Sequence, residues 1–266
     1  LLAISDTGNF VWIDVAADGF TPVAARLAPI LDEKGEAPRN KVSADAEGLA
    51  VIGDVALVSF EQEHRVLAYD LGACGAAARG APIVFDGFSG PFPKAFDQAG
   101  LKVTANQGAE GLAVTPGWMM AVGVETKSGE TSLVSARAIE SAPQFDLAVG
   151  ADLPELVGLD ILPADGNDRE LRLFSLHRSS NPLASTVIAI VETRLEASQD
   201  LAGVESDMAT RAQQRFRVKS SRVLAEMNVF VTIDNFEGLA ARRLPDGRVR
   251  LFVISVDNFS DRQRTL

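Results

Sequence analysis

The chain has 266 residues, 47% of them hydrophobic, and a formal net charge of −11. This length and apolar content suffice for one sizeable core, so we expect a single domain over residues 1–266. The acidic balance argues against a nucleic-acid partner, whose phosphates require a basic surface, and no run approaches the roughly 18 apolar residues that cross a membrane.

The first six residues form an apolar run that ends at Asp6, and this pattern predicts a β-strand. It matches the returning half of the hairpins found further along the chain. Its partner strand would then lie upstream of residue 1. We therefore expect the chain to begin inside a structural repeat.

A Glu-Gly-Leu tripeptide occurs three times, and each copy opens a short β-prone run. The copies are Glu47-Gly48-Leu49, Glu110-Gly111-Leu112 and Glu237-Gly238-Leu239. A turn and a second β-prone run follow each copy, which predicts a hairpin. In the first hairpin, pairing Ile52 with Val55 places Glu47 opposite Phe60. The returning strands lead to further acids, namely Glu61 or Glu63, Glu125 and Asp257.

A fourth hairpin departs from this pattern at both acidic positions. Its strands cover residues 156–161 and 171–176, and the second ends at His177 and Arg178, so an arginine replaces the acid. Residues 195–215, rich in Glu, Ala and Gln, are the best helical candidate or else a polar excursion between strands.

The copies recur every roughly 50 to 80 residues, and a further β-prone run follows each hairpin. This spacing favours four-stranded propeller blades with long loops. The glycines Gly48, Gly111, Gly158 and Gly238 would allow close strand approach near the axis. Equivalent strand ends would then converge on a central channel. The acids placed there are Asp6, Glu47, Glu61, Glu110, Glu125, Glu237 and Asp257.

Such clustered carboxylates cannot all stay ionised at close range without a cation or raised pKa values. Oxygen-only ligands favour a hard ion, and Ca²⁺ is preferred over Mg²⁺ because it accepts six to eight oxygens in loose geometry. Zinc is not expected, because His64 and His177 are far apart in sequence. Alternatively, each motif glutamate accepts hydrogen bonds from backbone amides of the neighbouring blade.

The sequence resembles the bacterial phytase-like family known as "esterase-like activity of phytase". The resemblance lies in Ser5-Asp6-Thr7-Gly8, in residues 106–112 and 234–239, and most specifically in residues 255–266. Val256 departs from the pattern, since an acid is common there. The resemblance implies an all-β, six-bladed β-propeller whose first blade is truncated at the N-terminus. It also implies Ca²⁺-dependent hydrolysis of phosphate esters in a periplasmic or secreted protein.

In that reading, Ca²⁺ bridges the acids and the phosphate and lowers the pKa of a bound water. Arg178 would clamp two phosphate oxygens, and His64 or His177 would protonate the leaving alkoxide. Arg178 could instead pair with an acid of the rim. Few basic residues stand near the strand ends, which favours a small phosphate ester or no catalysis. The alternative function is a non-catalytic propeller that binds a ligand or partner and holds structural Ca²⁺; the sequence leaves the oligomeric state open.

Overall fold

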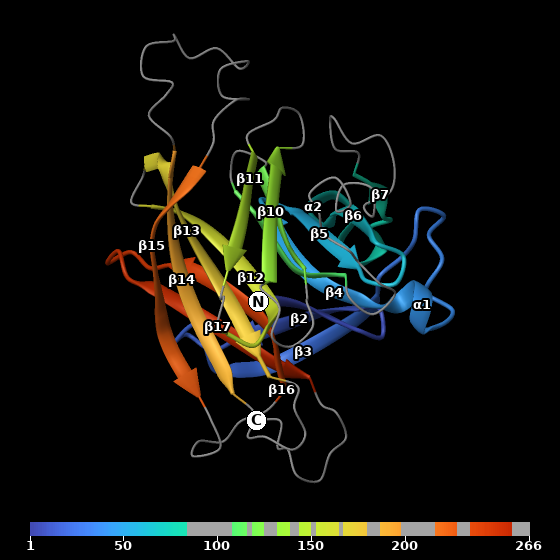
Figure 1. The fold of residues 1–266 in the computed structure, drawn as a ribbon. Coiled ribbons are helices and arrows are strands. Elements are labelled where there is room, and N and C mark those ends of the chain that lie inside the picture. Colours follow the sequence, from blue (N-terminus) through green and yellow to red (C-terminus); the bar gives the residue numbers. More distant parts are fainter. Residues whose placement is uncertain are drawn as a thin grey trace.

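The structure, a computed structural model, describes residues 1–83, 108–115, 119–124, 132–138, 144–149, 153–164, 167–179, 187–197, 216–227 and 235–256. Within these ranges the chain forms five antiparallel sheets that follow one another in sequence (Figure 1). In every sheet, strands that are consecutive in the chain are hydrogen-bonded neighbours. The all-β prediction is therefore confirmed for the described part of the chain.

The first sheet contains β1 (Leu2–Ser5), β2 (Asn9–Val15) and β3 (Pro22–Pro29). The second contains β4 (Ala46–Ile52), β5 (Val55–Phe60), β6 (Arg65–Asp70) and β7 (Ala81–Pro82). The third contains β8 (Ala109–Val114), β9 (Met119–Val124), β10 (Ser132–Ala138) and β11 (Gln144–Val149). The fourth contains β12 (Glu155–Ala164), β13 (Asn167–Arg178), β14 (Ile188–Ala197) and β15 (Phe216–Met227), and the fifth contains β16 (Asn235–Arg243) and β17 (Val249–Val256).

Three short helical segments lie in the first third of the chain: α1 (Lys41–Ala44), α2 (Leu71–Cys74) and the 3₁₀ turn η1 (Gly75–Ala77). Asn40 caps α1, because its side-chain oxygen accepts a hydrogen bond from the Ser43 backbone N–H at 3.1 Å. None of the helices in the described ranges is long and apolar enough to cross a membrane.

The sheets pack side by side through their first strands, with β4 against β8, β8 against β12 and β12 against β16. Second strands also contact the next sheet, as β5 contacts β8 and β13 contacts β16. Strand β1 contacts β4 in the same way. That β1 is the second strand of its repeat stays a prediction.

A buried apolar cluster fills the space between each pair of neighbouring sheets. Phe10 and Tyr69 belong to the cluster between the first and second sheets, and their rings meet edge to face with centroids 5.2 Å apart. The other three clusters join the second sheet to the third, the third to the fourth, and the fourth to the fifth. Burial of these side chains from water holds the sheets in order.

The Ile52–Val55 pairing is confirmed, but the prediction that Glu47 lies opposite Phe60 was wrong. Phe60 pairs with Ala46, because the register shifts between Ala46 and Leu49. Corresponding shifts occur in β8, β12 and β16. A β-bulge of this kind inserts an unpaired residue and redirects its side chain. In three of the four sheets the residue within the bulge is the glutamate of the Glu-Gly-Leu motif.

The glycines of the first two motifs allow a leucine of the next sheet to pack closely against them. A Cβ atom added at Gly48 would lie 2.8 Å from the Cβ of Leu112, and one at Gly111 would lie 2.7 Å from the Cβ of Leu159. Real side chains do not approach this closely, so the leucine of one sheet packs where the preceding sheet has only a glycine. The predicted close approach is confirmed at these positions.

Ser59 adds a polar tie at the first bulge. Its hydroxyl accepts a hydrogen bond from the Gly48 N–H at 2.8 Å and donates one to the Ala109 carbonyl of the next sheet at 2.7 Å. We expect Ser59→Ala to lower the free energy of unfolding by about 1–3 kcal/mol, because two buried backbone groups lose their partner. Urea denaturation would measure this, with the exposed Ser220→Ala as control. Equal midpoints for the two variants would contradict the prediction.

Two local predictions from sequence require correction. Strand β14 extends through Ala197, so residues 195–197 are not helical, and residues 198–215 lie outside the described ranges. His177 lies within β13 rather than beyond its end.

Candidate metal centre

Three carboxylates meet at one end of the second sheet. Asp45 immediately precedes β4, Glu47 lies in the bulge of β4, and Glu61 directly follows β5. One oxygen from each lies within 4.8 Å of the others. The hairpin brings the start of one strand beside the end of the next, and the bulge places Glu47 in the same cluster. We refer to these three residues as the acidic triad.

Asp45 is buried and contacts two neighbouring side chains. Its side chain is only 2% exposed, and the Gln62 amide donates a hydrogen bond to Oδ2 at 2.7 Å. Lys41 Nζ lies 3.2 Å from Oδ1 of Asp45 and 3.7 Å from Oδ2 of Asp6. Helix α1 thus brings one ammonium group to two acids, and the position of Asp45 is fixed on both sides.

Ionisation of Glu47 and Glu61 is disfavoured. Burial, followed by the charges of Asp45, Glu61, Glu237 and Asp6, raises the pKa of Glu47 to about 9. Burial also raises the pKa of Glu61, although a hydrogen bond with Glu110 opposes this rise. Glu47 therefore holds a proton at neutral pH. A divalent cation would have to displace that proton when it binds.

Glu237 reaches the same region from the fifth sheet. Its Oε1 accepts a hydrogen bond from the Asn235 amide at 2.7 Å and lies 2.9 Å from Arg178 Nη1. The alternative in which Arg178 pairs with a rim acid is therefore confirmed. The buried Nε of Arg178 has no hydrogen-bond partner within the described ranges, so this N–H remains able to meet a bound oxyanion.

His64 lies in the turn between β5 and β6. Its φ of 45° is a conformation that residues other than glycine seldom adopt, and its backbone N–H donates to the Glu61 carbonyl at 3.1 Å. Burial lowers its pKa. The buried Nδ1 finds no hydrogen-bond partner in the part of the chain that the structure describes. His64 is therefore held beside Glu61 with a ring nitrogen unengaged.

His177 differs from His64, because both of its ring nitrogens are engaged. Nε2 lies 2.9 Å from the Ser175 hydroxyl, and Nδ1 lies 3.0 Å from the Pro154 carbonyl oxygen. The side chain is fully buried, and burial lowers its pKa. These contacts favour a structural role, and proton transfer by His177 stays a prediction.

Five of the seven acids proposed from sequence lie within the described ranges, and they interact as a group. Asp6, Glu61 and Glu237 act electrostatically on Glu47, and Glu110 hydrogen-bonds with Glu61. Glu125 and Asp257 lie outside the described residues.

Asp45 was missed by the sequence analysis. It stands two residues before the bulge glutamate, where the fourth and fifth sheets carry the buried polar residues Glu155 and Asn235. That recurring polar position is the signal that could have identified it.

The chain matches the family described as "Phytase-like: Esterase-like activity of phytase" over residues 1–259. This match spans all five sheets and every residue of the acidic triad. The chain belongs to the phytase-like family. No curated protein matches the sequence.

The donor set of this phytase-like protein fits a hard cation. Asp45, Glu47 and Glu61 supply carboxylate oxygens, and no cysteine or histidine belongs to the triad. Oxygen donors of this kind suit Ca²⁺ and Mg²⁺ rather than zinc or copper.

Proposed function

We propose that this phytase-like protein is a calcium-dependent hydrolase of small phosphate esters, acting at the acidic channel of a six-bladed β-propeller. The observation that carries the proposal is the acidic triad, in which Asp45, Glu47 and Glu61 bring carboxylate oxygens within 4.8 Å. Family membership supports phosphate-ester chemistry. A phosphate approaching so acidic a rim would be repelled unless a cation lay between them, so the metal and the activity depend on each other.

Contacts between the first and fifth sheets support a closed propeller. Arg250 of β17 donates hydrogen bonds to the carbonyls of Asp18 and Gly19 at 3.3 and 3.4 Å. Its guanidinium also lies 5.4 Å from the ring centre of Phe20. The turn after β2 thus approaches the last described strand, as a ring of sheets requires. The number of six blades rests on the family.

When bound, calcium would supply positive charge that offsets the phosphate and promotes the ionisation of water. In our proposal Asp45, Glu47 and Glu61 hold the ion. Arg178 orients the phosphate through its unengaged Nε–H while its Nη1 stays on Glu237. His64 delivers a proton to the leaving alkoxide from its ring.

kcat should fall as the pH rises through the pKa of His64, which burial lowers from its ordinary value, because His64 then loses the proton that it donates. Substitution of His64 by Asn should remove this falling limb. A pH profile of phosphate release would test this. An unchanged falling limb in His64→Asn would exclude His64 as the proton donor.

Arg178→Lys should reduce kcat/KM for a phosphate ester by about 100-fold, because a point charge cannot reproduce the guanidinium fork. Calcium affinity, measured by calorimetry, should be retained. The matched control is Arg248→Lys, since Arg248 pairs with Asp246 two residues away in an exposed turn. Equal activity of the two variants would remove Arg178 from the proposed site.

The proposal as a whole is tested with purified protein in millimolar Ca²⁺ and a panel of phosphate esters. Hydrolysis should exceed that of a Glu110→Gln, Glu237→Gln control, and the activity proposal fails if it does not. Calcium at millimolar concentration is a condition of extracellular sites. We therefore propose a periplasmic or secreted location.

A non-catalytic propeller that binds a ligand or partner is the second candidate. It is favoured by two basic side chains of the protein that already pair with the acids. Lys41 already neutralises Asp45 and Asp6, and Arg178 already pairs with Glu237. Calcium binding without hydrolysis of any ester would support this second function.

A further inference from the structure

Lys41 is the first residue of helix α1, and its side chain ends beside the acidic triad. Its Nζ lies 3.2 Å from Asp45 Oδ1 and 3.7 Å from Asp6 Oδ2. The side chain of Asp45 is 2% exposed, whereas that of Lys41 is 67% exposed. A buried carboxylate therefore has as its counter-ion an ammonium group that is open to water.

The charge of Lys41 acts on the other two carboxylates of the triad as well. Contact with Asp45 chiefly raises the pKa of Lys41, and the charge of Glu47 adds to this rise. Lys41, like Glu110, opposes the rise that burial causes in the pKa of Glu61. One positive charge of the protein thus already interacts with the three acids that a metal ion would need.

The two carboxylate oxygens of Asp45 have different partners. Oδ2 accepts a hydrogen bond from the Gln62 amide at 2.7 Å. Oδ1 is buried and, apart from its ion pair with Lys41, has no hydrogen-bond partner within the described ranges. Oδ1 is therefore the oxygen of Asp45 that is available to a metal ion. An ammonium group and a divalent cation repel each other, so they do not share this oxygen.

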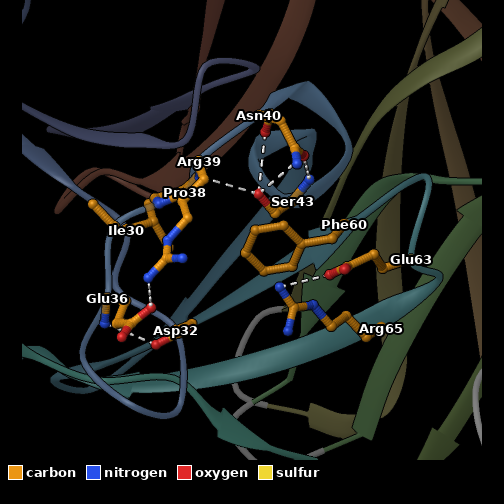
Figure 2. A pocket seen from close by; sticks show the side chains of 11 residues that line it. Ile30, Asp32, Glu36, Pro38, Arg39, Asn40, Ser43, Phe60, Glu63 and Arg65 are labelled. Atoms are coloured by element: carbon orange, nitrogen blue, oxygen red, sulfur yellow. Dashed lines mark hydrogen bonds and ion pairs between the residues drawn. The ribbon is translucent and has the colours of Figure 1, made fainter.

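Helix α1 fixes the backbone of Lys41 and leaves its side chain free to move. Asn40 Oδ1 accepts a hydrogen bond from the Ser43 N–H, and Ser43 Oγ donates one to the Asn40 carbonyl, both at 3.1 Å. Figure 2 shows these two residues at the start of the helix, in the wall of a pocket. Lys41 lies between them in the chain. Because most of its side chain is exposed, Lys41 can leave Asp45 without breaking the packing of the core.

We propose that Lys41 competes with calcium for the carboxylate of Asp45 and so sets the calcium concentration at which the triad binds the ion. A tethered competitor is always present at the site, and it weakens the apparent calcium affinity by the factor with which it occupies Asp45. This inference rests on the proposed function. The competition would confine activity to surroundings that are rich in calcium.

The first test is the calcium affinity of Lys41 variants, measured by calorimetry. Lys41→Gln removes the charge and keeps a hydrogen-bond donor, so it should bind calcium about tenfold more tightly than wild type. Lys41→Arg keeps the charge and should bind calcium with wild-type affinity. The matched control is Lys34→Gln, at an exposed lysine in the loop that follows β3.

Thermal unfolding gives a second readout that does not depend on activity. Without calcium, Lys41→Gln should unfold at a lower temperature than wild type, because the buried Asp45 loses its counter-ion. Saturating calcium should remove this difference, because Lys41 no longer contacts Asp45 in wild type. A difference that persists in calcium would show that Lys41 stays on Asp45, which overturns the competition.

Unchanged or weaker calcium binding by Lys41→Gln would also overturn the competition, and it would leave the metal centre and the hydrolase proposal intact. If wild type binds no calcium, the hydrolase proposal fails, and the variant still decides the role of Lys41. Calcium binding by Lys41→Gln alone would then uphold the competition. The absence of calcium binding by both proteins would overturn both proposals.

Discussion

Replacement of Glu192 by glutamine should lower the free energy of unfolding by about 3–5 kcal/mol. The side chain of Glu192 is fully buried on the fourth sheet, and its carboxylate is shared by three arginines. Arg172 Nε and Arg222 Nη2 each lie 2.6 Å from it, and Arg194 Nε lies 3.3 Å away. Loss of the negative charge leaves three guanidiniums close together without their counter-ion.

Urea denaturation of the variant would measure this loss, and Glu196→Gln is the matched control on the same strand. Glu196 pairs with Arg217, which is 65% exposed, so its substitution should cost less than about 1 kcal/mol. A similar loss in the two variants would show that the arginine cluster contributes little. The result would also measure how much ion pairs contribute to the stability of strands β13, β14 and β15.

The difference between wild type and Glu192→Gln should shrink in acid. Burial opposes ionisation of Glu192, but hydrogen bonds from Arg222 and Arg172 outweigh it and lower the pKa below the ordinary value of 4.5. The contribution is therefore fully present above pH 4.5, and it is lost as the pH falls through the lower pKa of the folded state.

Replacement of Glu47 by glutamine should have opposite effects without and with calcium. Without metal, the folded protein keeps a proton on Glu47 up to a pKa of about 9, whereas the unfolded chain releases it near 4.5. Between these values wild-type stability falls as pH rises, by up to about 1.4 kcal/mol per pH unit. Glu47→Gln removes this loss, which is about 2 kcal/mol at pH 6, so the variant should unfold at a higher temperature than wild type at that pH.

With calcium the order should reverse. A ligand at 100 times its Kd stabilises wild type by about 2.7 kcal/mol, and Glu47→Gln should lose this gain. Calcium binding to wild type should also release protons, which calorimetry in two buffers of different ionisation enthalpy would detect. Glu33→Gln, in an exposed turn, serves as control. Calcium binding by Glu47→Gln with wild-type affinity and proton release would remove Glu47 from the metal centre.

The recurring hairpins could be predicted from sequence because glutamate, glycine and leucine recur together at the start of a β-prone run. The order of the strands and the Ile52–Val55 turn follow from that pattern. The bulge does not, because an unpaired residue changes the register without changing the composition of the strand. The prediction that Glu47 lies opposite Phe60 was therefore wrong, although Glu47 does lie beside Glu61.

Residues of the candidate site could be predicted only where the same acid recurs at the equivalent position of several hairpins. Glu47 and Glu61 stand at equivalent positions of several hairpins, whereas Asp45 has a glycine, Gly108, as its counterpart in the third sheet. Lys41 reaches Asp45 from a helix of four residues, which is too short to show helical periodicity. Contacts that cross between sheets, such as the one between Arg178 and Glu237, depend on packing that a single strand does not reveal.

The close packing of Leu112 against Gly48 of the preceding sheet restricts where this chain can gain or lose residues. A single insertion between Glu110 and Leu112 would displace the leucine from Gly48 and turn Glu110 away from Glu61. Insertions in the connections between sheets disturb neither. Length differences among relatives should therefore accumulate in those connections, while the spacing within Glu-Gly-Leu stays fixed.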